Sequence, residues 1–516
     1  MNPALAAAVW MGLGLWPGAA EPARAAGDAR PFRITVVDAA TGRGVPMVEL
    51  ATTNGITLIT DSAGVIAFDE PGLMGTEVWF HVKAHGYAHA KDGFGYAGAR
   101  LRTAPGGSAT VKVDRVNIAE RLYRVTGQGI YRDSVMLGDT PPTREPLLSG
   151  GVLGQDSVQT CLYGGKVYWF WGDTNRASYP LGNFAMSGAT SELPPPAGRG
   201  LGPSRGVDLT YFVGADGFSR PMCPIEGQPG PVWCDGFVTA PDKTGRERML
   251  CHFARMKDLG TMYEHGFAAW NDERQVFEVV ARIPLDATLY ARGGGSPVRV
   301  SGPEGGFWYF ATPFPFVRCR AEFEALTDPA RYEAYTCLEH GARWSDESPR
   351  VEMKDGRPVW GWKRDTGLVL QKEQRTLIER GVLEAEEAPI RLLDAGTGKA
   401  VLGHAGTVAW NEYRRRWIMI VQEVWGSSLC GEVWYAEAPE ITGPWAEAVK
   451  IITHDDYSFY NVAHHRFFDQ EGGRVIYLEG TYTMAFSGTK APTPRYDYNQ
   501  IMYRLDLSDE RLRAAR

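Results

Sequence analysis

Three features are scarce in this 516-residue sequence: long apolar runs, clusters of basic residues, and cysteines at metal-binding spacing. Beyond the first 25 residues no segment approaches the roughly 20 apolar residues that a transmembrane helix needs, so we expect no membrane span. The net charge of −7 and the lack of a Lys/Arg cluster argue against nucleic acid as a partner. No C-x-x-C or H-E-x-x-H spacing occurs, which argues against a zinc ribbon, a redox pair or a dedicated metal site.

Seven cysteines are present, an odd number for an oxidising compartment. Cys223 with Cys234, and Cys319 with Cys337, are close enough in the sequence to close small disulfide loops. The alternative is that the cysteines are buried free thiols that behave as small apolar side chains. The sequence leaves both interpretations open.

The amino terminus resembles an export signal. An apolar run from Ala4 to Leu15 is followed by Ala23-Arg24-Ala25, an A-x-A-like cleavage site. The segment lacks a Lys or Arg ahead of the apolar run, so the alternative is a buried helix. We interpret residues 1–25 as a signal peptide, and expect a secreted or periplasmic protein.

Glycine, proline and aromatic residues are plentiful, with 61 Gly, 33 Pro, 16 Trp, 22 Tyr and 21 Phe. Few stretches show long helical periodicity, so this mixture favours many short strands joined by turns and predicts an all-β fold. The length exceeds what a single core usually supports, which predicts at least two domains.

Residues 31–118 carry an Asp/Gly turn before Val45-Pro46, then Thr60-Asp61 and Gly64 before an apolar strand, and finally Gly86-Tyr87. This pattern resembles the carboxypeptidase-regulatory or prealbumin-like β-sandwich modules of secreted bacterial hydrolases. The resemblance implies a small β-sandwich that acts as a spacer or support, without chemistry. Residues 119–146 end in a Pro-rich stretch and are predicted to be a linker.

Residues 147–510 contain five candidate units, each opening with small or polar residues before a strand, a turn and a second strand. The openings are Gln155-Asp156-Ser157, Cys234-Asp235-Gly236, Gly294-Gly295-Ser296, Gly403-His404-Ala405 and Tyr460-Asn461-Val462. We interpret this region as a five-bladed β-propeller. The last strand-like segment, 496–507, is expected to seal the ring by pairing beside the first unit.

Two carboxylates flank the first predicted hairpin. Asp156 comes just before the first strand, Gly164-Gly165 forms the turn, and Asp173 follows the second strand. Antiparallel pairing brings Asp156 and Asp173 together at one rim of the sheet. Like charges side by side are unfavourable unless the protein uses them.

In a propeller, the unit openings converge on one end of the central channel. The predicted set at this funnel is Asp156, Asp235, Ser296, His404 and His464 from the openings, Asp173, Glu423 and Glu479 from the second strands, and the aromatic residues Trp171, Trp233, Trp425, Tyr460 and Tyr482. Carboxyl groups can cleave a glycosidic bond by acid and base catalysis, and flat aromatic rings stack on sugars. The pattern therefore favours a carbohydrate site.

The first-unit motif, Gln155-Asp156-Ser157 with Trp169-Phe-Trp-Gly-Asp173-Thr-Asn175, is similar to the domain-of-unknown-function 4185 family and its relatives. Some of these are arabinan-cleaving glycoside hydrolases, and they resemble five-bladed arabinanases and xylosidases. Val433 to Trp445 also resembles a strand-to-turn segment of such glycosidases. The resemblance implies that Asp156 and Asp173 act together.

We interpret the protein as a glycoside hydrolase for a polysaccharide or oligosaccharide. Asp156 and Asp173 are the predicted acid/base pair, and Glu423 is a reserve acid. The predicted substrate contacts are Asp235, His404, His464, Trp171, Trp425, Glu479 and Asn175. The resemblance requires no cofactor, although such propellers can hold a structural Ca²⁺.

Several alternatives stay open. Asp156 and Asp173 are residue types that also form ordinary turns, and the histidines can be structural. The protein could be a carbohydrate-binding propeller without chemistry. It could also be a polysaccharide lyase, which would use a Tyr/His or Lys base on uronic acids.

Overall fold

The computed structural model describes residues 30–183, 185–195, 201–227, 229–258, 260–291, 297–302, 305–310, 313–455 and 457–515. The predicted signal peptide and Ser296 lie outside these residues. The described part is nearly all β, as predicted, with helices at α1 (Arg132–Met136), α2 (Phe323–Leu326) and α3 (Gln371–Glu379). None of these helices has the length and apolar character needed to cross a bilayer.

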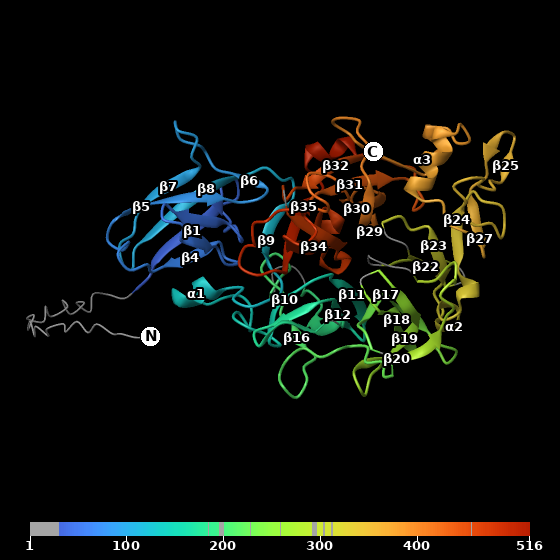
Figure 1. The fold of residues 1–516 in the computed structure, drawn as a ribbon, viewed down its shortest axis with the longest axis horizontal. Coiled ribbons are helices and arrows are strands. Elements are labelled where there is room, and N and C mark those ends of the chain that lie inside the picture. The colour runs from blue at the N-terminus through green and yellow to red at the C-terminus, as the bar shows by residue number, and fades with distance from the viewer. Residues whose placement is uncertain are drawn as a thin grey trace, which may run out of the picture.

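Two four-stranded sheets form the first part of the chain, shown in blue in Figure 1. Their strands are β1 (Phe32–Asp38), β2 (Glu49–Thr52), β3 (Thr57–Ile59), β4 (Val65–Phe68), β5 (Glu77–Lys83), β6 (Tyr87–Ala88), β7 (Gly98–Arg102) and β8 (Ser108–Arg115). The sheet orders are β4-β1-β8-β6 and β3-β2-β5-β7. Residues alternate between buried and half-buried along β1, and one apolar cluster draws on both sheets. This alternation explains why the segment forms strands.

Five sheets of four or five strands, the five large sheets, follow in chain order. The first sheet contains β11 (Gln159–Tyr163), β12 (Lys166–Trp171), β15 (Ser187–Glu192) and β16 (Thr210–Tyr211), and the second contains β17 (Val232–Pro241), β18 (Glu247–Met256), β19 (Met262–Asn271) and β20 (Val276–Arg282). The third contains β21 (Val298–Val300), β22 (Phe307–Phe310), β23 (Val317–Arg320), β24 (Glu333–Thr336) and β27 (Gly361–Arg364). The fourth contains β29 (Gly403–Asn411), β30 (Arg416–Glu423), β31 (Val433–Ala438), β32 (Trp445–Ile452) and β28 (Ile390–Asp394). The fifth contains β33 (Ser458–His464), β34 (Val475–Thr483), β35 (Asn499–Asp506) and β9 (Glu120–Arg124).

Smaller pairings complete the β structure of the described residues. They involve β10 (Val152–Gln155), β13 (Thr174–Arg176) and β14 (Tyr179–Asn183), and β25 (Met353–Lys354) with β26 (Arg357–Pro358). Five short 3₁₀ turns lie at Pro329–Arg331, Ala385–Glu387, Arg466–Phe468, Glu471–Gly473 and Glu510–Ala514.

Apolar clusters join the five large sheets in a ring. One cluster joins the first sheet to the second, the next joins the second to the third, and others join the third to the fourth and the fourth to the fifth. A further cluster joins the fifth sheet back to the first. Figure 1 shows these sheets succeeding one another around a common centre. Burial between successive sheets therefore supports the whole arrangement.

The segment that seals the ring differs from the prediction. Strand β35 pairs with β34 of its own sheet, so segment 496–507 packs against the first sheet but does not pair with it. The outer partner of β35 is β9, which comes from the predicted linker 119–146. All five β9 residues are buried. An early segment thus completes the last sheet.

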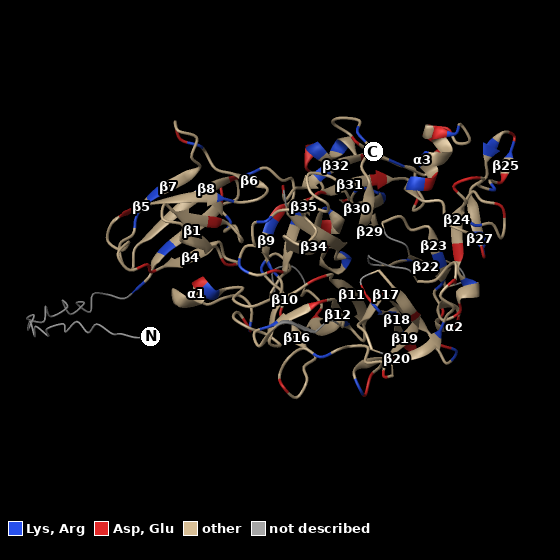
Figure 2. Cartoon of the chain, in the orientation of Figure 1, with Lys and Arg blue, Asp and Glu red and all other residues tan. Residues whose placement is uncertain are grey.

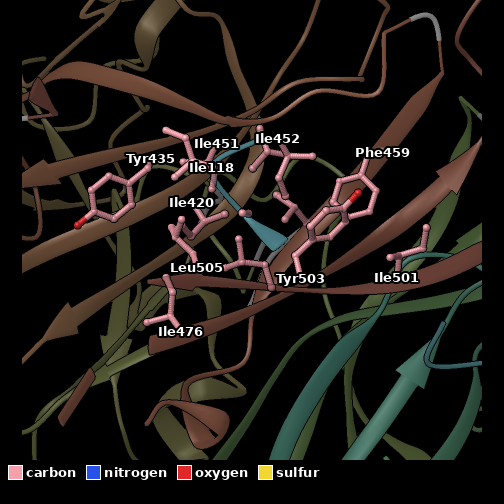
Figure 3. Packing of buried hydrophobic residues seen from close by; sticks show 14 of the residues in the cluster. Ile118, Ile420, Tyr435, Ile451, Ile452, Phe459, Ile476, Ile501, Tyr503 and Leu505 are labelled. Carbon is pink, nitrogen blue, oxygen red and sulfur yellow. The ribbon is translucent and has the colours of Figure 1, made fainter. Parts of the chain in front are cut away.

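The two parts of the molecule are tightly joined. The buried Arg121 donates hydrogen bonds to the backbone oxygens of Pro46 and His85 in the first part, and to the Tyr503 hydroxyl in the fifth sheet. Figure 3 shows Ile118, just before β9, packed among Tyr435, Ile451 and other residues of the fourth and fifth sheets. The first part is therefore anchored on the ring by buried contacts.

All seven cysteines are buried free thiols, so the disulfide pairings considered for Cys223 with Cys234 and Cys319 with Cys337 are absent. The thiols of Cys161, Cys223, Cys234 and Cys251 lie in the apolar cluster between the first two sheets. They act there as small apolar side chains.

We expect Leu122→Ala to lower the free energy of unfolding by about 2–4 kcal/mol, because Leu122 is fully buried in the cluster that joins the fifth and first sheets. Leu162→Ala is the matched control, since Leu162 is 48% exposed, and it should change stability by less than about 0.5 kcal/mol. Urea unfolding followed by tryptophan fluorescence measures both. Equal losses in the two variants would contradict the role of β9.

Candidate functional site

A cavity of about 540 Å³ opens where the innermost strands of four large sheets begin. Its lining residues are Asp156, Ser157, Gln159, Gly172, Asp173, Met186, Trp233, Cys234, Asp235, Ala254, His404, Val424, Leu429, Cys430, Tyr460, Asn461, Phe486 and Tyr498. The predicted residues Asp156, Asp173, Asp235 and His404 are therefore brought together from distant parts of the chain. The volume is in the range of small-molecule sites.

Asp156 and Asp173 are adjacent, as the hairpin predicted. The Asp156 amide donates to the Asp173 carbonyl oxygen at 3.1 Å, and the Gly172 amide donates to the Asp156 carbonyl oxygen at 2.9 Å. A Cβ atom on Gly172 would lie 2.4 Å from Asp156 Oδ1. Only glycine leaves room there for the Asp156 carboxyl group.

The environment of the two carboxyl groups favours their protonated forms. Burial, followed by the neighbouring charge of Asp173, raises the pKa of Asp156 to about 7. Burial alone raises the pKa of Asp173 to about 6. The Tyr460 hydroxyl donates to Asp156 Oδ2 at 2.7 Å, which partly offsets the rise. Between about pH 6 and pH 7, Asp156 is therefore mainly protonated while Asp173 is mainly ionised.

Three of the innermost strands are irregular where they reach the cavity. The pairing register shifts between Asp235 and Val238 in β17, between Gly403 and Ala405 in β29, and between Tyr460 and Ala463 in β33. Such bulges change the direction of side chains and occur often beside active sites. They place Asp235, His404 and Asn461 at the cavity.

Strained backbone accumulates at the same place. Ser157, Asn461 and Phe486 line the cavity with φ values of 60°, 53° and 62°, in the left-handed region that favours glycine. Asn461 Nδ2 donates to Ser157 Oγ at 2.7 Å, which links two of the strained residues. Non-glycine residues in this region cluster at functional sites.

Glu423 lies beside the cavity lining. Its carboxylate accepts a hydrogen bond from Trp434 Nε1 at 2.7 Å, and the following residue, Val424, lines the cavity. Burial raises the pKa of Glu423. Trp425 is 74% exposed in the adjoining loop, so it lies outside the lining.

Four other predicted contacts lie elsewhere. Trp171 is fully buried and stacks on Trp169, and Glu479 is fully buried with its carboxyl oxygen 3.0 Å from His465 Nε2. His464 ends its strand, so it lies on a second cavity of about 580 Å³, where it contacts Asp469 at 2.7 Å. Asn175 lines a third cavity of about 460 Å³. Alternation along the strands and the direction of β33 account for these differences.

Other aromatic residues complete the site. Tyr460 and Trp233 line the cavity as predicted, whereas Tyr482 is buried and its hydroxyl contacts His85. Sequence reasoning missed Phe486, which comes from the connection between β34 and β35 and shows no periodic pattern, and Tyr498, which lies in the strand-like segment 496–507 that was expected only to pair beside the first unit.

No group of three or more His, Cys, Asp or Glu side chains in the described residues is arranged to hold a metal ion. The expected calcium ion stays a prediction.

Comparison with protein-family models found no match, and no curated protein matches the chain. Among solved structures, the chain is similar to exo-beta-1,3-galactanase from Phanerochaete chrysosporium, with 10% identity, a TM-score of 0.38, and coverage of 75% of this chain and 65% of that one. It is also similar to exo-1,5-alpha-L-arabinanase from a bovine ruminal metagenomic library (11% identity, TM-score 0.32, 69% and 94% covered) and to alpha-L-arabinanase from Cellvibrio cellulosa (10%, 0.35, 69% and 92%). Sequence identities of 10–11% and TM-scores of 0.32–0.38 do not assign the chain to a family.

Asp156→Asn tests the electrostatics of the pair. Asp156 has a pKa of about 7 in the folded protein, compared with about 3.9 in an unfolded chain. The folded state therefore binds more protons between these values, and the stability linked to Asp156 is lost as the pH rises through 7. At about pH 8 we expect the Asn variant to be more stable than the wild type by roughly 1–3 kcal/mol, after allowance for partial exposure.

This stabilisation should shrink at about pH 5, where the wild-type carboxyl is protonated. Unfolding curves at the two pH values measure it. Asp114→Asn, at an exposed position of β8, is the control and should show no such pH dependence. A pH-independent effect of Asp156→Asn would contradict the raised pKa.

Proposed function

We propose that this protein is an exported glycoside hydrolase whose five large sheets form a five-bladed β-propeller and whose first two sheets form a β-sandwich. One observation carries the functional part: adjacent carboxyl groups with raised pKa values line a cavity large enough for a sugar ring. Glycosidic bonds are cleaved by such carboxyl pairs, one protonated and one ionised.

The Asp156–Asp173 pair supplies both forms near neutral pH. The ionised Asp173 takes a proton from water, and the protonated Asp156 offers a hydrogen bond to a substrate oxygen. Tyr460 fixes the orientation of Asp156 through the 2.7 Å hydrogen bond. Glu423, one residue from the lining, is the reserve acid.

Aromatic side chains favour a saccharide as the ligand. Trp233, Tyr460, Phe486 and Tyr498 line the cavity, and Phe486 is 60% exposed. Flat rings of this kind stack on the apolar faces of sugars. Figure 2 shows Lys and Arg interspersed with Asp and Glu along the drawn elements. A neutral polysaccharide or oligosaccharide is therefore the proposed substrate.

We also propose that the protein is exported and that a calcium ion binds in the channel of the propeller. The Ala4–Leu15 run and the Ala23-Arg24-Ala25 site support export to the periplasm or the medium.

Asp156→Asn and Asp173→Asn should each lower kcat by about 10²- to 10⁴-fold on a substrate found in a panel of polysaccharides and aryl glycosides. Asp114→Asn is the surface control and should keep wild-type turnover. Reducing-end release measures the rate. Undiminished turnover in both cavity variants would remove the assignment.

The same panel of substrates distinguishes a hydrolase from the two alternative functions. A carbohydrate-binding propeller would bind a glycan without turnover and would keep its affinity after both substitutions. A polysaccharide lyase would release an unsaturated product that absorbs ultraviolet light. Either result would replace the hydrolase proposal.

The pH profile of kcat/KM should be a narrow bell. Protonation of Asp173 removes the base below about pH 6, and loss of the proton from Asp156 places two charges in the cavity above about pH 7. Because the two carboxyl groups interact, the acidic and basic limbs of the profile report apparent pKa values of the pair rather than of either residue. A profile that stays flat from pH 5 to about pH 9 would contradict the role of the pair.

A further inference from the structure

The second cavity, of about 580 Å³, lies at the far end of two strands that begin at the first cavity. In β29, His404 lines the first cavity and Trp410 lines the second, and these positions are roughly 20 Å apart along an extended strand. In β33, Tyr460 lines the first cavity and His464 lines the second. Among the described residues, no side chain lines both cavities, so they are separate sites.

One histidine of the second cavity has a ring nitrogen left for a ligand. His464 is 4% exposed, and its Nε2 lies 2.7 Å from Asp469 Oδ1. Its Nδ1 forms no hydrogen bond with any residue that the structure describes. A largely buried polar group without a partner costs free energy, so Nδ1 is placed to bond a group that enters the cavity. A hydroxyl group suits Nδ1 in either protonation state of the ring, because a hydroxyl both donates and accepts.

Charges of both signs balance around the second cavity. Arg299, Arg466, Glu412 and Asp469 line it. The first three are exposed and take part in no ion pair within the described part of the chain, so their charged groups are open to a ligand. Two guanidinium groups against two carboxyl groups give little advantage to a ligand with a net charge. Together they offer donors and acceptors, both of which bond hydroxyl groups.

Aromatic rings supply the flat surfaces of this cavity. Trp308, Trp410 and Phe467 are half-buried and line it. Trp308 Nε1 donates to the Thr239 carbonyl oxygen at 2.9 Å, and the Trp410 ring meets Trp417 edge to face, with 5.8 Å between centroids. These contacts hold both rings in place before a ligand arrives, which lowers the entropic cost of binding. Such rings pack well against the apolar faces of sugars.

We propose that the second cavity is a binding site for a neutral oligosaccharide, separate from the site of cleavage. Its rings fit the apolar faces of a sugar, and the His464 nitrogen and the balanced charges fit its hydroxyl groups. The volume is in the range of small-molecule sites. This site goes beyond the proposed hydrolase function, because it is argued from its own residues and needs no reaction. A glycan bound there would keep the protein attached while the first cavity is free.

Titration calorimetry with xylotriose, arabinotriose and galactotriose tests the site. The Asp173→Asn protein is used, because the proposed base is absent and the probes are not consumed. In this protein, Trp410→Ala should weaken binding of the best probe at the second cavity by about tenfold or more, because a stacking ring is lost. Arg466→Ala should weaken it by about three- to tenfold, because a charged donor is lost. Arg466 is exposed, so this variant decides the question if Trp410→Ala does not fold.

Two further variants are the controls. Tyr413→Ala is matched to Trp410→Ala, because Tyr413 is 44% exposed in the turn after β29 and lies outside the cavity lining. Its affinity for the probe should equal that of the parent protein. Phe486→Ala removes a ring from the first cavity and should spare the binding event that Trp410→Ala weakens.

Three results would overturn the proposal. One is a lack of binding by all three neutral probes, and another is binding that Trp410→Ala and Arg466→Ala leave unchanged. The third concerns charge: trigalacturonate that binds more tightly than every neutral probe, and is weakened by the same variants, would show that the ligand is acidic.

The hydrolase function and the second site fail in different ways. A wild type without turnover on any glycoside would overturn the hydrolase proposal, whereas the titrations need no turnover and would still decide the second site. Full turnover with no probe bound at the second cavity would overturn the site alone.

Discussion

Pairing between β9 and β35 is the interaction on which the rest of the molecule depends. It completes the fifth sheet with a strand from the start of the ring, so the fifth sheet lies against the first. Across this seam, the Tyr460 hydroxyl reaches Asp156 and the Asn461 amide reaches Ser157. The carboxyl pair therefore owes its orientation to residues about 300 positions later in the chain. Without closure, Asp156 would face solvent and keep an ordinary pKa.

The backbone departs from regular β geometry where the strands reach the cavity. The register shifts in β17, β29 and β33 lie at the cavity, as do the left-handed residues Ser157, Asn461 and Phe486. Each irregularity destabilises the chain locally, and strands packed on both faces hold it in place. Register shifts also occur away from the cavity, in the pairings of β19 with β20, β31 with β32 and β35 with β9.

Much of the arrangement could be predicted from local patterns. The Gly164-Gly165 hairpin predicted that Asp156 and Asp173 meet, because a two-residue turn fixes the register over a short distance. The unit openings predicted Asp235 and His404 at the same cavity. Trp171 and Glu479 were misplaced, because an alternating strand gives no sign of which face a propeller buries. His464 was misplaced because it ends β33, away from the cavity at the start of that strand, and lines the second cavity instead.

Other parts could not be predicted, because they depend on contacts between distant segments. Nothing in Glu120–Arg124 distinguishes a closing strand from an amphipathic linker, and its burial follows from a partner some 380 residues away. Asp235, His252 and His265 lie on three strands, so their hydrogen bonds appear only when the second sheet is formed. Phe486 comes from the connection between β34 and β35, which has no periodic pattern, and Tyr498 comes from its end, just before β35.

The position of Arg121 bears on how such a chain can evolve. Its guanidinium group binds backbone oxygens of the first part and the hydroxyl of Tyr503, so both parts share one buried charge. Recombination that exchanged the first part for an unrelated module would strand this cation in an apolar interior, at a cost of several kcal/mol. The two parts should therefore be inherited together, and the pair behaves as a single evolutionary unit rather than as an enzyme with an interchangeable appendage.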